Sequence, residues 1–316
     1  MESVPCNLCG STDFAFVYRR PDGVFFPDEW FDVVACRSCG LGFVNPRPTI
    51  EEMSRFYQGG YYTPLVDEDH TRRYELQRAY LRSVAPGDGP PRLLDVGCGM
   101  GDFPRYMANL GWDAEGVEIY CDVPVDDFPV HRQPFDRLTG MDGKFDAVTA
   151  WAVLEHVHDP MGYFVNAGRV LKKGGLFVFL VTNFESLSSR HLFQEDVPRH
   201  IYFFTRGTVE KFLRHGGMEL VSSDHGAGIT AMGARGAVAY FFTRFVKGRP
   251  YEWRDRPIGY REYLSNENLM TGPVSLLRFA ISHPIAFLDR LVEPLVVQGQ
   301  KRLGSYGITT YVARKL

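Results

Sequence analysis

The sequence predicts an α/β fold built on a mostly parallel sheet, and three observations carry this prediction. From Arg92 onward, short buried strands alternate with helical segments, the pattern of a parallel sheet covered on both faces. A glycine-rich turn at residues 97–101 connects the first of these strands to the first helix. Four of the six cysteines form two CxxC pairs near the N-terminus, which predicts a separate segment before the sheet.

The composition is that of a folded protein, with 45% hydrophobic and 23% charged residues in a chain of 316. The 35 lysines and arginines against 38 acidic residues give a formal charge of −3, which disfavours affinity built on nucleic-acid phosphates. The chain opens with no signal-peptide pattern. Residues 274–297 are apolar but interrupted by charges and prolines, so they do not predict a membrane span. We therefore expect a cytoplasmic protein.

The expected elements follow in chain order. The N-terminal segment predicts strands at 14–18, 31–35 and 41–44, and a helix at 71–84 precedes a linker at 86–91. The later strands are expected at 93–96, 113–117, 145–150, 176–181, 218–222 and 307–314, with a turn at 172–175. Helices are expected at 102–110, after the third of these strands, and at 209–215.

About 80 residues separate the last two strands, too many for a loop in a compact domain, so they carry structure of their own. This insertion either covers a binding site or only packs on the core. Its basic side chains either face a phosphate or an anionic membrane or form a solvated surface. They are Arg244, Lys247, Arg249, Arg254, Arg256 and Arg261.

The two cysteine pairs, Cys6 with Cys9 and Cys36 with Cys39, have the spacing of zinc-binding knuckles. Two thiolates on each tight turn complete a tetrahedron, and four protein ligands leave no position for a substrate. We therefore expect a structural zinc ion. A disulfide or a redox pair is the alternative, which a reducing compartment disfavours.

The turn at 97–101 contains Gly97, Gly99 and Gly101 and opens a helix, so a ligand can approach its backbone. Glu118 ends the following strand, where a carboxylate can accept both hydroxyls of a ribose. The turn lacks the GxGxxG spacing of dinucleotide sites and the GK[ST] of a P-loop. An adenosine without a pyrophosphate is the expected ligand.

These motifs resemble those of class I S-adenosylmethionine methyltransferases. The stretch from Asp95 to Gly101 matches motif I, and the stretches at 145–150, 153–157 and 171–175 continue the match in order. The resemblance implies a Rossmann-like seven-stranded sheet whose last strand is antiparallel. It implies that Asp95, Gly97, Cys98, Gly99 and Gly101 hold the methionine part of S-adenosylmethionine, and that Glu118 holds the ribose. It further implies that Ala150 and Trp151 line the methionine side and that Phe135 or Asp136 lies near the adenine.

A narrower resemblance covers nearly the whole chain. The cysteine pairs, the Asn-Pro-Arg-Pro stretch at 45–48 and the tyrosines Tyr61 and Tyr62 precede the core, as in bacterial methyltransferases with an N-terminal zinc-binding domain. Several of those act on sugars or sugar nucleotides, including deoxysugars. The chain is thus expected to divide into a zinc ribbon (1–62), a helical linker (63–91), a cofactor-binding core (92–226 and 304–316) and a helical insertion (227–303).

His200 is the candidate catalytic base, because histidine accepts protons near neutral pH and a histidine in the matching segment can serve the zinc-domain family in this way. A histidine that only pins the next helix is the alternative. In sugar C-methyltransferases of this type an acid may precede that histidine, but here the neighbour is Arg199, which favours an oxygen acceptor or a bound phosphate. Glu155 and His156 are expected to open the helix after the third strand and to shape the pocket floor.

The sequence therefore predicts a methyltransferase that uses S-adenosylmethionine, carries a structural zinc ion and methylates a sugar or a sugar nucleotide on oxygen or carbon. An RNA methyltransferase is one alternative, which the acidic ribbon disfavours. A cofactor-binding module without catalysis, whose ribbon recruits a partner, is the other. The oligomeric state is left open.

Overall fold

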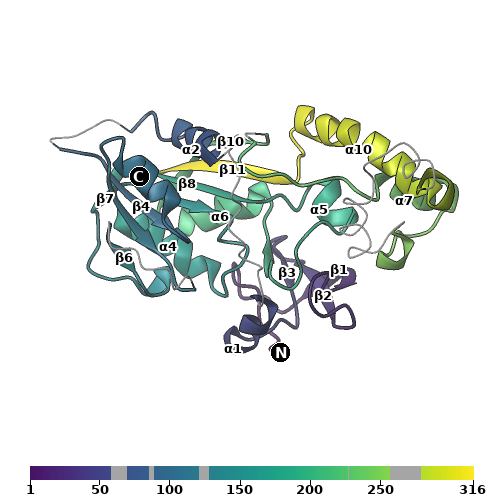
Figure 1. The fold of residues 1–316 in the computed structure, drawn as a ribbon. Helices are drawn as coiled ribbons and strands as arrows, with labels where there is room; N and C mark the ends of the chain where they lie inside the picture. Colours follow the sequence, from purple (N-terminus) through teal and green to yellow (C-terminus); the bar gives the residue numbers. More distant parts are fainter. Residues whose placement is uncertain (58–69, 85–88, 121–127, 227, 257–278) are drawn as a thin grey trace.

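The computed structural model describes residues 1–57, 70–84, 89–120, 128–226, 228–256 and 279–316 (Figure 1). Its main sheet has seven strands in the order β10-β11-β8-β7-β4-β5-β6. They are β4 (Arg92–Val96), β5 (Asp113–Val117), β6 (Val130–His131), β7 (Phe145–Trp151), β8 (Leu171–Thr182), β10 (Met218–Asp224) and β11 (Ile308–Lys315). Neighbours from β6 to β8 run parallel, and β11 is antiparallel to both β8 and β10. The expected Rossmann-like seven-stranded sheet is confirmed.

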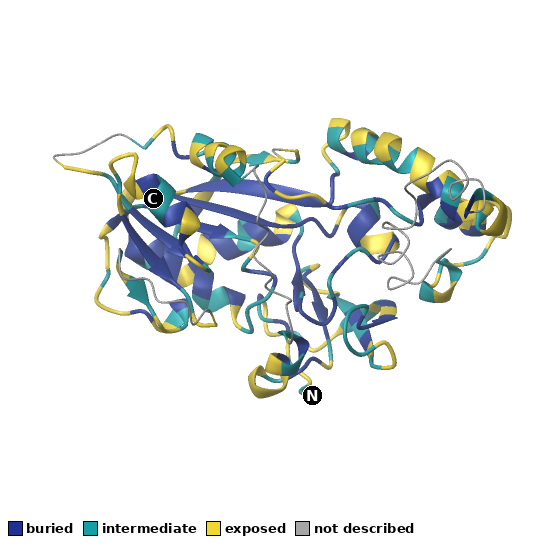
Figure 2. Cartoon of the chain, viewed as in Figure 1, coloured by how far each residue is buried: buried dark blue, intermediate teal, exposed yellow. Residues whose placement is uncertain are grey.

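Helices cover both faces of this sheet because alternate strand residues point to opposite sides. Leu94, Val148 and Phe177 belong to the core under α4 (Pro160–Val170) and α6 (Arg206–His215). Leu93, Ala147 and Val178 belong to a second core under α3 (Asp102–Ala108), which packs against α2 (His70–Ala79). Figure 2 shows the resulting dark strands between partly exposed helices.

A second, four-stranded sheet holds the N-terminal segment, in the order β1-β2-β3-β9. Its first three strands are β1 (Phe14–Pro21), β2 (Trp30–Cys36) and β3 (Gly42–Val44). The fourth, β9 (Tyr202–Phe203), comes from the segment that follows β8 and α5 (Leu187–His191), and the sequence pattern does not reveal it. The N-terminal sheet is therefore joined to the core by main-chain hydrogen bonds. It is followed by α1 (Ile50–Met53) and η1 (Ser54–Tyr57).

Two local expectations differ from the structure. The turn expected at 172–175 lies inside β8, where the register with β7 shifts between Phe145 and Ala147. The helix expected to reach residue 84 ends at Ala79, and hydrogen-bonded turns continue the chain to Val84. Both differences concern element ends, which side-chain patterns specify weakly.

The insertion is helical, as expected. Its described elements are α7 (Ala237–Phe241), η3 (Phe242–Val246), η4 (Trp253–Asp255) and α10 (Pro284–Arg302). Helix α10 packs on α7, and both lie at one end of the molecule in Figure 1, away from β6. Among the described residues, no helix combines the length and the apolar character needed to cross a membrane.

Candidate functional site

The glycine turn after β4 has a closed side and an open side. Gly97, Gly99 and Gly101 all have positive φ angles, +70°, +55° and +82°, which favour glycine. A Cβ atom at Gly97 would lie 2.5 Å from Cγ2 of Val153, whereas no atom of the described residues lies within 4 Å of one at Gly99. The turn thus fits tightly against the loop after β7 and leaves space above Gly99 for a ligand.

Glu118 stands beside that space at the end of β5. Its Oε2 atom accepts a hydrogen bond from the amide of Gly99 at 2.9 Å. Its Oε1 atom accepts from the amides of Ile119 and Tyr120, each at 2.8 Å. Since β5 pairs with β4, the carboxylate and the glycine turn lie at the same edge of the sheet, where a vicinal diol could bind both.

Asp95, at the C-terminal end of β4, lies buried beneath the same edge. The Thr149 hydroxyl donates to its Oδ1 at 2.6 Å from the paired position on β7. Burial raises the pKa of Asp95 to about 7, although the hydrogen bond from Thr149 opposes this shift. A bound ammonium group would favour the ionised form.

Ala150 and Trp151 end β7 next to Asp95. Ala150 is buried, and the Trp151 ring meets Phe103 edge-on at 5.8 Å. The indole Nε1–H of Trp151 is buried and has no hydrogen-bond partner among the described residues. A buried donor of this kind fits an acceptor group supplied by a ligand. The next residue, Ala152, has a positive φ of +58°, a strained conformation at this edge.

The structure separates the two candidates for the adenine side. Phe135 is buried and meets Tyr163 edge-on at 5.5 Å, so its ring belongs to the core. Asp136 is half-buried beside the start of α4, and burial, together with the charge of Asp159, raises the pKa of its carboxyl group. Of the two, only Asp136 keeps a side chain with access to a ligand.

His200 forms the centre of a second group. Its Nδ1 lies 2.7 Å from Oε2 of Glu195, and because a carboxylate only accepts, Nδ1 donates. Glu195 is fully buried and also accepts from the hydroxyl of Ser189. Burial alone would lower the pKa of His200, but the hydrogen bond and charge of Glu195 outweigh it and raise the pKa. This arrangement leaves Nε2 as the proton acceptor.

His156 and Tyr57 connect this group to the cofactor edge. The His156 ring meets His200 edge-on at 4.7 Å, and its Nδ1 lies 3.1 Å from the Arg199 carbonyl oxygen and 3.2 Å from the Tyr57 hydroxyl. Tyr57 in turn stacks on Tyr120, two residues after Glu118. Burial and the neighbouring His200 lower the pKa of His156 to about 3, so His156 stays neutral.

Glu155 completes the cluster. It is buried, its Oε2 has no hydrogen-bond partner among the described residues, and burial raises its pKa to about 7. Donor atoms of Glu155, His156 and His200 lie within 4.8 Å of one another. Glu155 and His156 lie in the loop before α4 rather than on the helix, which corrects the expectation that they open it.

Arg199 has a structural position. Its side chain is fully buried and pairs with Asp22 at 2.9 Å and with Asp196 at 2.5 Å. A guanidinium group engaged in this way does not face a phosphate, so that expectation is wrong. Arg20 donates to the carbonyl oxygens of Phe193 and Glu195, so Arg20 holds the start of the loop that carries His200, and Asp22 holds it next to His200 through Arg199.

Comparison with known proteins bears on the larger part of this site. Residues 69–223 match the sequence profile of a family described as "Methyltransferase domain". We refer to this part of the chain as the methyltransferase domain, after the profile that it matches. Two curated relatives are both named "Ubiquinone biosynthesis O-methyltransferase". The protein from Pasteurella multocida is 27% identical over 128 residues, 34% of this chain and 53% of the relative. The protein from Cereibacter sphaeroides is 34% identical over 102 residues, 29% of this chain and 41% of the relative.

The chain spans about half the length of the curated relatives it matches. Among solved structures, an S-adenosylmethionine dependent methyltransferase from Mesorhizobium loti aligns with a TM-score of 0.44 at 15% identity, covering 76% of this chain and 98% of the other. That likeness is too distant to bear on function.

The four cysteines come together outside the methyltransferase domain. Their sulfur atoms lie within 4.8 Å of one another, with 3.4 Å between Cys6 and Cys39 and 3.5 Å between Cys9 and Cys36. Disulfide sulfurs lie about 2.05 Å apart, whereas sulfurs around a tetrahedral zinc ion at about 2.3 Å lie near these separations. The donor set and spacing therefore fit zinc and exclude a disulfide in this structure.

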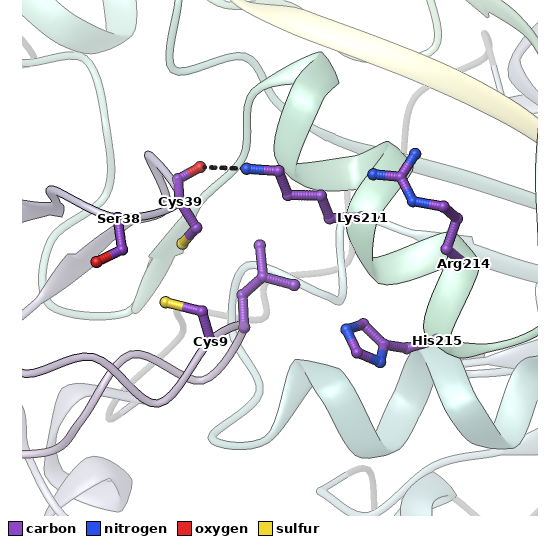
Figure 3. A pocket seen from close by; sticks show the side chains of 7 residues that line it. Cys9, Ser38, Cys39, Lys211, Arg214 and His215 are labelled. Carbon is purple, nitrogen blue, oxygen red and sulfur yellow. Dashed lines mark hydrogen bonds between the residues drawn. The ribbon is translucent and has the colours of Figure 1, made fainter.

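Helix α6 of the methyltransferase domain faces this cluster across a cavity of about 550 Å³ (Figure 3). Lys211 donates to the carbonyl oxygen of Cys39 at 3.1 Å, and Arg214 and His215 line the same cavity. The basic side of α6 thus complements the negative charge that four thiolates bring. The sequence predicted the four cysteines but not their position against α6.

The remaining residues that the sequence singled out lie in the N-terminal segment and in the insertion. Tyr61, Tyr62 and Arg261 lie outside the described residues. In the insertion, Arg249 pairs with Asp255 at 2.5 Å and Arg254 with Glu252 at 2.8 Å, so these two arginines are engaged within the insertion. Sequence reasoning missed Glu195 and Tyr57, because nothing in their spacing relates them to His200. The only hint was that two acidic residues, Glu195 and Asp196, stand shortly before His200 in the sequence.

Proposed function

We propose that this protein transfers a methyl group from S-adenosylmethionine to a small molecule, with His200 as the general base. The observation that carries the proposal is the hydrogen-bonded pair of His200 and Glu195, linked through His156 and Tyr57 to the end of β5. A base oriented by a carboxylate next to a cofactor pocket is the arrangement that methyl transfer to a weakly acidic group requires.

The residues around the glycine turn fit the cofactor. Glu118 would accept hydrogen bonds from the ribose hydroxyls. The space above Gly99 would let the ligand lie directly against the main chain of the glycine turn. Asp95 would face the α-amino group and the orphaned indole N–H of Trp151 the carboxylate end, with Gly97, Cys98, Gly101 and Ala150 as walls. S-adenosylmethionine supplies an electrophilic methyl group when bound. The residues of the chain would orient the acceptor toward this methyl group and exclude water from the site.

His200 would take the acceptor proton on Nε2. The Nδ1–H bond to Glu195 fixes the ring and stabilises the imidazolium that forms, which is why the pKa of His200 is raised. His156 stays neutral beside it and so adds no competing positive charge. The loop that carries His200 would keep its geometry through the buried pair of Arg199 and Asp22.

For the acceptor we propose a sugar or a sugar nucleotide, methylated on oxygen or carbon, on the strength of the N-terminal motifs. The residue before His200 in the sequence is Arg199 and not an acid, but Glu195 places a carboxylate against the His200 ring in the fold. This supports a base strong enough for methylation of either oxygen or carbon. The names of the curated relatives favour instead a hydroxyl group of an intermediate in ubiquinone biosynthesis. Both classes present a hydroxyl group to His200, and the experiment below separates them.

The zinc ion is proposed to be structural. Cys6, Cys9, Cys36 and Cys39 would fill its coordination sphere, so it would brace the sheet that holds Arg20 and Asp22. We expect one zinc ion per chain by elemental analysis, and the Cys36→Ser variant should lose this zinc.

Two alternative functions are not favoured. The net charge disfavours RNA methylation, and the names of the relatives together with the intact cofactor site disfavour a role without catalysis.

The test is incubation with methyl-labelled S-adenosylmethionine and separate pools of nucleotide sugars, hydroxylated prenyl quinols and total RNA. Label in the sugar pool supports the proposal in full. Label in the quinol pool keeps the mechanism and replaces the acceptor. Label in RNA, or the absence of label in every pool despite cofactor binding, would overturn the acceptor class.

A further inference from the structure

Helix α10 of the insertion exposes a row of apolar side chains and buries polar ones. Asp289 and Gln300 are buried on its inner face. Its outer face carries exposed apolar side chains at the spacing of one helical stripe: Ile285, Leu288, Leu291 and Leu295. Leu291 is 58% exposed and Leu295 is 72% exposed. The inner face also packs Val296 and Val297 against the core, so α10 is apolar on both sides, whereas an amphipathic surface helix normally has one apolar face.

Hydrogen bonds fix this orientation. Asp289 accepts from the backbone amides of Gly236 and Val238 at the start of α7. Glu293 accepts from the amide of Ala234 at 2.9 Å, and Gln300 bonds the hydroxyl of Ser188 at 3.1 Å. A rotation of α10 that buried the leucines would break these bonds and leave backbone amides unpaired. These hydrogen bonds therefore keep the apolar stripe of α10 facing outward.

A second apolar group lies on the neighbouring segment, α7 and η3. Phe241, Phe242, Phe245 and Val246 are all exposed, and Phe245 is 74% exposed. The rings of Phe241 and Phe245 stack at 5.9 Å, and the basic side chains of Arg244 and Lys247 flank Phe245 and Val246 and are exposed. We define the insertion surface as these four residues together with Ile285, Leu288, Leu291 and Leu295.

Among the described residues of the insertion, the net charge is positive. Residues 228–256 and 279–303 contain nine lysines and arginines and four acidic residues. Each of the four acids is engaged: Glu252 with Arg254, Asp255 with Arg249, Asp289 with backbone amides, and Glu293 with the amide of Ala234. Arg244, Lys247, Arg290 and Arg302 are exposed. The surface thus combines outward apolar groups with outward positive charge.

We propose that the insertion surface binds the surface of an anionic phospholipid bilayer. Apolar side chains entering the headgroup boundary, with lysine and arginine beside them, are the features of an interfacial segment that lies on a membrane. A second copy of this chain would cover the leucines but would bring Arg290, Arg244 and Lys247 against like charges. Charge complementarity therefore selects the bilayer as the occupant.

The experiment is co-sedimentation of the full chain, without cofactor or acceptor, with vesicles of equal parts phosphatidylglycerol and phosphatidylcholine. The protein should bind these vesicles, bind pure phosphatidylcholine far less, and be released by salt. Leu291→Ser with Leu295→Ser, and separately Arg244→Glu with Lys247→Glu, should each weaken binding by about tenfold or more. Because these side chains are exposed, the variants should fold.

Matched controls come from exposed positions outside the insertion. Phe16→Ser removes an exposed ring from β1 and Lys173→Glu reverses an exposed charge near the start of β8, and neither should change vesicle binding. If the wild-type protein does not co-sediment with the anionic vesicles, the proposal is wrong. A dimer, measured by light scattering, that Leu291→Ser with Leu295→Ser abolishes while no vesicles are bound would assign the surface to a second copy. The assay needs no turnover, so its outcome is independent of the proposed function.

Discussion

The cofactor side and the acceptor side of the proposed site are built in different ways. The cofactor side comes from two short stretches, Asp95 to Glu118 and Ala150 to Trp151, at the ends of adjacent strands. The acceptor side brings His200 and Glu195 together with His156 from the loop after β7 and Tyr57 from the N-terminal segment. The first is formed by neighbouring strand ends of one sheet, whereas the second depends on packing between the main sheet and the N-terminal segment.

The difference extends to what supports each side. The glycine turn is held by its own φ angles and by Val153, within the methyltransferase domain. The loop that carries His200 is held from outside by Arg20 and Asp22 of the N-terminal sheet. Changes in the acceptor side should therefore leave cofactor binding intact, and the following predictions test that separation.

The largest expected effect is on turnover, from His200→Ala. Loss of a general base should lower kcat by about a thousandfold, while affinity for S-adenosylhomocysteine by calorimetry stays within about twofold. His215→Ala, on the exposed end of α6, is the matched control and should change neither. Unchanged turnover at saturating acceptor would remove His200 from the mechanism.

The next effect is on stability, from Arg199→Met. This change leaves Asp22 buried without its guanidinium partner, and we expect a loss of about 3–5 kcal/mol in the free energy of unfolding measured in urea. Arg206→Met breaks an exposed pair with Glu210 on α6 and should cost under about 1 kcal/mol. Equal losses for the two arginines would contradict the assigned role of Arg199.

A smaller effect is expected from Glu195→Gln on the pH profile. Glu195 raises the pKa of His200, so its neutralisation should lower that pKa. The base form would then exist at lower pH, and the rising limb of kcat/KM should move to lower pH by about one unit, with a fall in kcat of about tenfold. Glu210→Gln is the control. A fall in activity without any shift would make Glu195 a packing residue only.

The smallest effect concerns the cofactor side alone. Because burial raises the pKa of Asp95 to about 7, its carboxylate becomes ionised between pH 6 and 8, and affinity for the ammonium group of S-adenosylhomocysteine should rise about tenfold over that range. Calorimetry at the two pH values measures this. Asp95→Asn should flatten the dependence, and His200→Ala should not. A flat dependence in the wild type would show that Asp95 does not meet the ligand's charge.

The sequence could point to the proposed cofactor side because the signal there is local. Glycines at 97, 99 and 101 are needed where the backbone turns through positive φ, and Glu118 ends the adjacent strand. The four cysteines were equally readable from their spacing. Glu195 was not, because it approaches His200 through a loop whose shape depends on contacts with β1.

By itself, the sequence pattern determined six of the seven strands of the main sheet, the glycine turn, Glu118 and the cysteine pairs, since strand periodicity and backbone conformation act over a few residues. The short strand β6 (Val130–His131) was implied only by the family resemblance. The tertiary structure alone decided that β9 joins the N-terminal sheet, that Arg199 is buried against Asp22, and that Glu195 orients His200. It also decided which side of α10 faces outward. Pairings between residues far apart in the chain depend on burial and charge compensation, which only the folded arrangement supplies.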